Sequence, residues 1–127
     1  MKYVPASEGR FVPASHEDAV HPGVLKRVIA TDSDINSGQV MMVNWARLPA
    51  RSSFRRHYHE DMQEIFVLIR GQVRMTVDET SVDMALGDTV IIESSEIHEM
   101  LNLLDSDAEY IVFGVSAGNG GRTIVVP

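Results

Sequence analysis

Residues 57–71 read HYHEDMQEIFVLIRG and combine a His-x-His pair, a carboxylate and an apolar run that ends at a glycine. Alternate residues of a β-strand point to the same face, so His57 and His59 present both imidazoles to one side while Tyr58 points away. Glu64 follows a short irregular stretch and begins the apolar run. The spacing therefore predicts a metal site made by two strands, in which Glu64 adds a carboxylate oxygen.

A second cluster follows a short interval later, with Gly87, His98 and Asn102. His98 can complete the ligand set from this part of the chain, which gives three imidazoles and one carboxylate. Such a set has no thiolate and is harder than a structural zinc cage, so it suits Mn, Fe, Ni, Cu or catalytic Zn. We therefore predict one divalent transition metal, with four protein ligands. They are His57, His59, Glu64 and His98.

Both clusters resemble the two motifs of the cupin family. The first motif, G-x5-H-x-H-x3,4-E-x6-G, and the second, G-x5-P-x-G-x2-H-x3-N, depart from this chain only at turn positions. The leading glycine falls on Arg51, the proline on Glu93 and the second glycine on Ser95. The resemblance implies an all-β fold, the double-stranded β-helix or jelly-roll barrel, with one mononuclear metal inside. The matched positions are His57, His59, Glu64, Gly71, Gly87, His98 and Asn102.

Gln63, the residue before Glu64, is an alternative candidate for the fourth ligand. Small cupins with four histidine ligands place the third histidine four residues after the His-x-His pair, which is Gln63 here. The spacing to Gly71 favours Glu64, whereas the spacing from His59 allows Gln63. An anionic ligand offsets the charge of a divalent ion in a low-dielectric cavity and a neutral amide does not, so Glu64 is preferred.

The other polar candidates are assigned ordinary roles. His16 and His21 lie in a polar stretch interrupted by proline and glycine, where solvated loop histidines are expected. Trp45 and Arg47 alternate with Asn44 and Ala46 on a predicted strand and are candidates for a cavity wall. Packing of Trp45 in the core and exposure of Arg47 are the preferred interpretation.

Several further side chains are predicted to be structural. Asn102 is assigned as a turn amide and Gly71 as a hairpin residue. Five apolar side chains are predicted to fill the barrel rather than take part in chemistry. They are Phe66, Leu68, Met75, Met100 and Ile111.

The rest of the chain predicts many short strands at even spacing with little helical period, as in a β-sandwich or barrel. Residues 1–23 are irregular and interrupted by proline, and predict an arm that wraps the barrel. Residues 24–127 are predicted to form a single barrel domain. The expected strands cover 24–30, 39–48, 64–69, 72–77, 82–86, 89–92, 97–103, 109–116 and 122–126.

The length, charge and composition of the chain exclude several classes of protein. A chain of 127 residues is long enough for one domain with a real core. Its formal charge of −7 argues against a nucleic-acid surface, which needs a basic stripe. It has no cysteine, so it has neither disulfides nor thiol redox chemistry. Its start lacks the apolar core of a signal peptide and no apolar run reaches membrane-spanning length, so we expect a cytoplasmic protein without a membrane partner.

Apolar runs such as Ile65–Ile69 predict a partner chain. A strand in a small barrel needs one apolar face, but these runs are apolar on both faces. The second face requires cover from the arm, another sheet layer or another subunit. We therefore expect a homodimer.

Four protein ligands on a six-coordinate metal leave two positions for water, dioxygen or a chelating substrate. Three neutral imidazoles and one carboxylate leave roughly one net positive charge on a divalent ion, which favours an anionic or enolisable oxygen ligand. Cupins host many unrelated activities, so a dioxygenase-type oxidoreductase, a metal-dependent isomerase or lyase, and a non-enzymatic small-molecule-binding module are all compatible with the resemblance. The oxygenase, acting on a small oxygenated or anionic substrate, is preferred because spacing reveals no acid–base residue besides the ligands.

Overall fold

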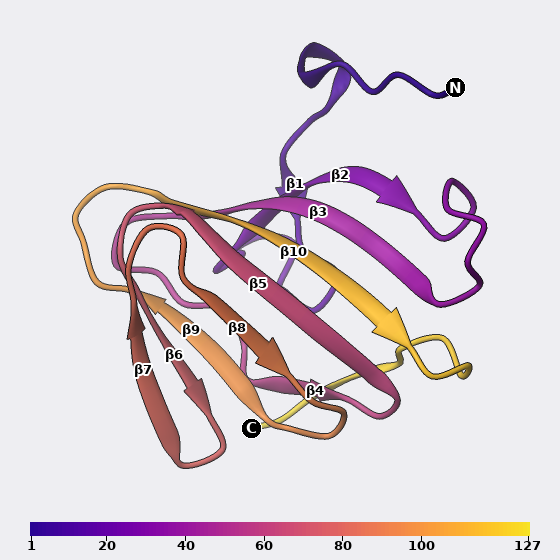
Figure 1. The fold of residues 1–127 in the computed structure, drawn as a ribbon. Coiled ribbons are helices and arrows are strands. Elements are labelled where there is room, and N and C mark those ends of the chain that lie inside the picture. The colour runs from indigo at the N-terminus through magenta and orange to yellow at the C-terminus, as the bar shows by residue number, and fades with distance from the viewer.

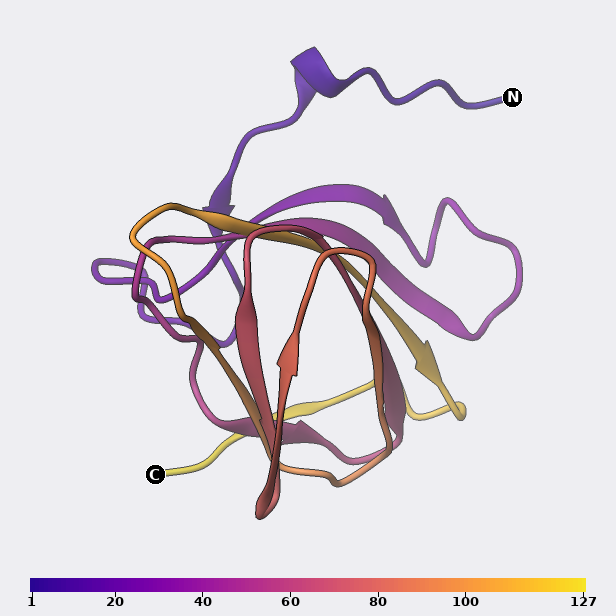
Figure 2. The same cartoon turned by 60° about the vertical axis from the view of Figure 1, so that its left-hand side comes forward.

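Two antiparallel sheets face each other and enclose the interior of the protein (Figures 1 and 2). The structure is a computed structural model that describes residues 1–127. The six-stranded sheet has the order β1-β2-β3-β10-β5-β8, and the five-stranded sheet has the order β11-β4-β9-β6-β7. A single 3-10 turn, η1 (Ala6–Glu8), precedes the strands. The strands are β1 (Val12–Pro13), β2 (Leu25–Thr31), β3 (Val40–Leu48), β4 (His57–His59), β5 (Met62–Arg70), β6 (Val73–Val77), β7 (Thr80–Met84), β8 (Thr89–Ile92), β9 (His98–Asn102), β10 (Ala108–Ser116) and β11 (Thr123–Val125).

This arrangement confirms the predicted all-β jelly roll, and the expected strands lie within two residues of the observed ones. Two starting points differ. Strand β5 begins at Met62, so the irregular stretch after His59 is shorter than expected. Strand β7 begins at Thr80 because Asp78, with a φ of 51°, already turns the chain. None of the helical segments has the length and apolarity needed to cross a membrane.

The apolar core fills one end of the space between the sheets. Strand β10 buries every second residue, so its inner face carries Ala108, Tyr110 and Val112. Ile111 therefore points to the outer face, and the prediction that it fills the barrel is wrong. The other four predicted filler residues are buried as expected. Each fully buried aliphatic side chain of this kind contributes about 1.5–3 kcal/mol to stability. The least exposed apolar residues at this end are Leu48, Leu68, Val73, Met75, Met100 and Ala108.

The turn positions that depart from the cupin motifs keep the backbone conformation that favours glycine. Arg51 has a φ of 59° and Ser95 has a φ of 68°, although an L-residue in this region costs roughly 1–2 kcal/mol. Gly71 joins β5 to β6 with a φ of 89°, and a Cβ added there would lie 3.1 Å from the Cβ of Ala108. The loops that hold the two motifs therefore keep their shape without the motif glycines.

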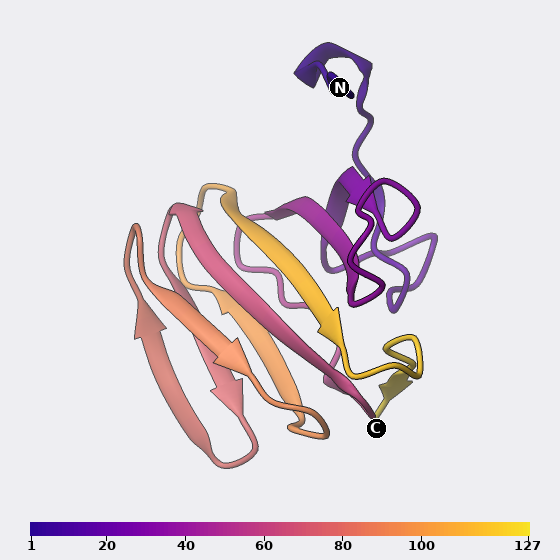
Figure 3. The ribbon, with the colours of Figure 1, turned by 45° about the vertical axis from the view of Figure 1, so that its right-hand side comes forward.

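The N-terminal segment divides into two parts. Its first residues, up to η1, extend away from the sheets (Figure 3). Strand β1 then pairs with β2, and the loop that follows lies against the end of the barrel. The carboxylate of Glu17 fixes this loop, because it accepts hydrogen bonds from Gly23 N at 2.6 Å and from Arg55 N at 2.8 Å. The loop is thus tied directly to the segment that leads into β4.

Candidate metal centre

The four predicted ligand residues come together between the two sheets. Strand β4 turns His57 and His59 inward on alternate positions, and β9 places His98 directly opposite His57. Glu64 arrives from the inner face of β5 in the other sheet. All four side chains are buried, and one ligand atom from each lies within 4.8 Å of the other three. The cluster therefore joins the two sheets at one point.

Each histidine of the cluster is oriented by a contact on its Nδ1 atom. His57 Nδ1 lies 2.6 Å from the Arg55 carbonyl oxygen, and His98 Nδ1 lies 2.9 Å from that of Glu96. His59 Nδ1 lies 3.1 Å from Thr123 Oγ1. These two contacts occupy the Nδ1 side of His57 and His98, so Nε2 is the ring nitrogen left to face the centre of the cluster. This is the arrangement in which metal-ligating histidines are usually held.

Glu64 is the electrostatic centre of the cluster. Its Oε1 lies 2.8 Å from His59 Nε2 and 3.0 Å from His98 Nε2. Burial is the largest single influence and favours the neutral carboxyl, but the hydrogen bonds and charges of the two histidines together outweigh it and lower the pKa of Glu64. Burial, with His16 and His98 nearby, lowers the pKa of His57 to about 3. The site therefore offers a carboxylate and a neutral imidazole, the forms that bind a metal.

Gln63 takes no part in this cluster. Alternation along β5 turns it to the opposite face, where its Nε2 donates to Glu93 Oε2 at 2.8 Å. The geometry thus brings Glu64, and not Gln63, to the histidines. Spacing alone left both open, because the start of β5 decides which of two adjacent residues faces inward.

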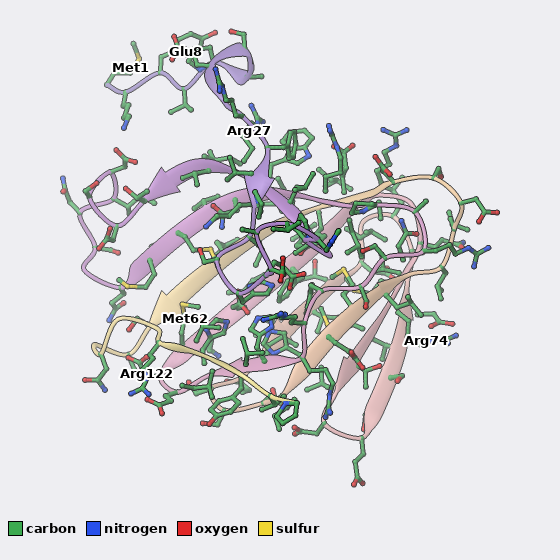
Figure 4. The ribbon with its side chains drawn as sticks, turned by 180° about the vertical axis from the view of Figure 1, so that it is seen from behind. Met1, Glu8, Arg27, Met62, Arg74 and Arg122 are labelled. Atoms are coloured by element: carbon green, nitrogen blue, oxygen red, sulfur yellow. The ribbon has the colours of Figure 1, made fainter.

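A cavity of about 200 Å³ opens beside the cluster. His57, His59 and Glu64 line it, whereas His98 lies behind them. Met62 covers one side and packs beside the C-terminal loop (Figure 4). A cavity of this size is smaller than the roughly 300–1,000 Å³ typical for drug-sized ligands, so it suits a small metabolite.

His16 corrects the expectation of a solvated loop residue. Its ring stacks on His57 with centroids 4.1 Å apart, and its edge meets Phe54 at 5.6 Å. Its Nε2 is buried 3.3 Å from Glu17 Oε2, yet no atom there completes a hydrogen bond of good geometry. Burial outweighs the nearby carboxylates and lowers the pKa of His16. No motif or spacing in the sequence predicts that His16 lies beside the cluster, because the loop held by Glu17 brings it there.

The cavity wall on β3 uses the face opposite to the one considered from sequence. Asn44 and Ala46 are buried and line the cavity. Trp45 lies on the outer face, where Nε1 donates to Glu109 at 3.2 Å, so its assignment to the core is wrong. Arg47 lies on the outer face, as preferred from sequence. The alternation of side chains along β3 was predicted correctly, but the face that points inward was not.

Two further polar residues of the wall were not singled out from sequence. Tyr110 lines the cavity from β10, and burial raises the pKa of its hydroxyl. Lys26 lines it from β2, with Nζ donating to Ser15 Oγ at 2.8 Å, and half-burial lowers its pKa. Lys26 is the only Lys or Arg among the lining residues. None of these positions belongs to a motif, so only the folded chain identifies them.

The fold and the buried cluster define a small single-domain cupin. The family of the cupin domain matches residues 44–114, more than half of the chain, and the chain belongs to this family. The match spans the His-x-His pair, Glu64 and His98. A search of curated protein sequences finds no significant match.

Solved structures share the fold at low sequence identity. A predicted oxalate decarboxylase of Thermotoga maritima superposes with a TM-score of 0.79 at 22% identity, covering 91% of this chain and 99% of the other. The polyketide cyclase RemF of Streptomyces resistomycificus gives 0.79 at 14% identity over 100% and 86%. A cupin sugar phosphate isomerase of Silicibacter pomeroyi gives 0.72 at 20% identity over 91% and 76%. At these identities the likeness concerns the fold alone.

Proposed function

We propose that this cupin is a metal-dependent enzyme that acts on a small oxygenated or anionic substrate. The observation that carries the proposal is the buried cluster of four ligand atoms within 4.8 Å of one another, three of whose residues face a cavity. The donor set fits one divalent transition ion, Mn, Fe, Ni, Cu or Zn, because it combines neutral imidazoles with a single carboxylate. The proposed ligands are His57, His59, Glu64 and His98.

A bound ion would supply Lewis acidity toward a carbonyl or enol oxygen of the substrate. The chain would supply the rest. The Nδ1 contacts hold the imidazoles in place, and the apolar side chains of Met42, Met62 and Phe66 limit the entry of water. A small substrate would lie between this wall and the loop that carries His16.

Among reaction classes, the geometry favours an isomerase or lyase that moves a proton. The sequence argument for an oxygenase depended on the lack of an acid–base residue besides the ligands. His16 and Tyr110 line the cavity outside the proposed ligand set, and both carry exchangeable protons. The names of the similar structures, an isomerase, a cyclase and a predicted decarboxylase, point the same way.

The dioxygenase-type oxidoreductase is the second candidate. It is favoured by the apolar half of the wall, since 11 of the 21 lining residues are hydrophobic and a dry cavity suits the activation of dioxygen. Its substrate would be of the same small, oxygenated class.

Metal analysis of protein purified without chelator tests the proposal first. Protein with about one bound transition metal per chain is then incubated in D₂O with 2-oxo acids and 1,3-diketones, and NMR follows deuterium entering the carbon next to the carbonyl. Incorporation that is lost in Tyr110→Phe or His16→Ala, with no oxygen uptake, supports the isomerase or lyase. Oxygen uptake without deuterium incorporation selects the oxygenase, and neither activity selects a non-enzymatic binding module.

A homodimer is proposed for the outer face of the six-stranded sheet. Phe113 pairs with Ile65, and Ile111 pairs with Val67, so these half-buried side chains form one continuous apolar surface. A face of this kind is normally covered by another chain. Light scattering at micromolar concentration should give twice 14.1 kDa. Phe113→Glu should yield the monomer while Val82→Glu, on the other sheet, should not; a wild-type protein of only 14.1 kDa would count against the dimer.

A cytoplasmic location, with no membrane or nucleic-acid partner, stays a prediction.

A further inference from the structure

The wall formed by the six-stranded sheet, opposite the three histidines, holds polar groups that make no hydrogen bond within the chain. Asn44 is 6% exposed, makes no side-chain hydrogen bond, and its Oδ1 is fully buried. Tyr110 is 3% exposed, and its hydroxyl makes no hydrogen bond to another residue. Both line the cavity. Polar groups inside a protein are nearly always paired, so a ligand bound in the cavity can pair with the Asn44 amide and the Tyr110 hydroxyl, which the chain leaves unpaired.

The sheet register places these two groups side by side. Asn44 pairs with Val112 across β3 and β10, and Tyr110 lies two residues from Val112 on the same inner face. Such diagonal neighbours have Cα atoms about 7–8 Å apart, within reach of one small ligand. Glu64 lies on the inner face of the same sheet, on the neighbouring strand β5, whereas the three histidines come from the facing sheet, so the pair lies opposite the histidines.

The chemistry of the pair identifies what it would recognise. The Asn44 amide can donate through Nδ2 or, after its side chain rotates, accept through Oδ1, and the Tyr110 hydroxyl can donate or accept. A hydroxyl group on the ligand satisfies both. Lys26 adds a positive charge to the same cavity, with its Nζ placed by Ser15 Oγ at 2.8 Å. A ligand that meets all three residues carries both a hydroxyl and a carboxylate.

We propose that Asn44 and Tyr110 form a hydroxyl-recognition subsite and that Lys26 binds the carboxylate, so the substrate class is the small hydroxy acids. The inference rests on the proposed function, because a further oxygen of the same ligand would face the metal cluster. It assigns Asn44 a role in specificity, whereas a structural asparagine in the middle of a sheet would have bonded to its surroundings. The cavity of about 200 Å³ limits the ligand to a small molecule.

The test titrates zinc-loaded protein by calorimetry with glycerate, malate and tartrate, and with propionate and succinate as their analogues without hydroxyls. We expect at least one hydroxy acid to bind at least tenfold more tightly than its analogue. Asn44→Leu and Tyr110→Phe should each reduce this preference about 5- to 30-fold, the value of one or two hydrogen bonds. Lys26→Met should weaken acid and analogue alike, by about tenfold. Tyr58→Phe is the matched control, because Tyr58 points away from the cluster and does not line the cavity.

Two results would overturn the subsite. One is a wild-type protein that binds hydroxy acids no better than their analogues. The other is a preference that persists in both variants, since the metal alone would then select the hydroxyl. Zinc is redox-inert and the titration needs no turnover, so a negative result on protein with one zinc per chain rejects the subsite and leaves the proposed function standing. Wild-type protein that holds no metal would reject both.

Thermal unfolding gives a readout that a structural role would not. Asn44→Leu replaces an unpaired buried amide with an apolar group of similar size, so the ligand-free, zinc-loaded variant should melt higher, by roughly a few degrees. A lower melting temperature would show that Asn44 supports the fold and would overturn its assignment to the ligand.

Discussion

Two buried asparagines lie at opposite ends of the interior, and only one of them makes side-chain hydrogen bonds. The Nδ2 of Asn102 lies within 3.1 Å of three carbonyl oxygens, and its Oδ1 accepts from Leu104 N at 2.9 Å. Asn44 is almost as deeply buried and makes no such bond. One amide holds a turn together, whereas the other faces a cavity. Burial therefore does not distinguish the two asparagines, but hydrogen bonding does.

The same contrast applies to the surroundings of the two residues. Around Asn102 the inner faces carry Leu48 and Val73, both without exposed surface, and every polar group of the side chain has a partner. Around Asn44 the wall faces imidazoles, a carboxylate and unpaired polar atoms, which cost stability. Proteins keep such local costs mainly where they bind or react with something. The closed end stabilises the fold, and the open end holds the proposed metal centre and the proposed subsite.

The largest expected effect is at the open end. His59→Ala should abolish stoichiometric metal binding, because three remaining ligands lose both affinity and geometry. Metal content after desalting measures the loss, with His21→Ala as the control, since His21 is exposed and does not line the cavity. Full metal occupancy in His59→Ala would show that His59 is not a ligand and would contradict the proposed metal site.

The next prediction compares the effects of two adjacent residues of β5, Glu64 and Gln63, on metal affinity. Glu64→Ala should lower metal affinity by more than about 100-fold, which exceeds the usual 10- to 100-fold effect of a residue that only contacts a ligand. Gln63→Ala should have little effect, because its side chain contacts Glu93 on the outer face. Competition with a chromogenic chelator gives both affinities. The reverse ranking would move Gln63 into the site.

At the closed end, Asn102→Leu should destabilise the protein by about 2–4 kcal/mol, since it leaves a buried backbone N–H and several carbonyl oxygens without partners. Denaturant unfolding measures the change. Asn44→Leu, the same substitution at the open end, should shift stability in the opposite direction. Equal losses in the two variants would contradict the division into a structural and a functional end.

The last prediction is a pH dependence of stability that arises at the open end. The pKa of His57 is lowered to about 3 in the folded protein, so between pH 6.5 and pH 3 the unfolded chain binds a proton that the folded chain does not. Stability of the metal-free protein should fall with acidification across this window, by up to about 1.4 kcal/mol per pH unit. His57→Gln should flatten the slope between pH 6.5 and 4.5. An unchanged slope would show that His57 is not neutral in the fold.

The local structure of the chain could be predicted from its sequence. Alternation placed His57 and His59 on one face, because the period of a strand is two whatever surrounds it. The fold class, the strands and the position of His98 relative to the first motif followed from spacing and from the cupin motifs. The two turn positions without glycine kept their backbone conformation, so those departures changed no part of the site.

The tertiary structure alone decided which face of a strand with large side chains on both faces points inward. On β3 and β10 both faces carry large side chains, so composition did not tell Asn44 from Trp45 or Val112 from Ile111. Register with neighbouring strands makes that choice, and a shift of one residue reverses it. His16 depended on a contact across the chain, the loop tied to Arg55 N by Glu17. Local periodicity and motif spacing thus indicated the residues of the cluster, while packing between distant segments decided that Glu64 rather than Gln63 joins it and what the cluster faces.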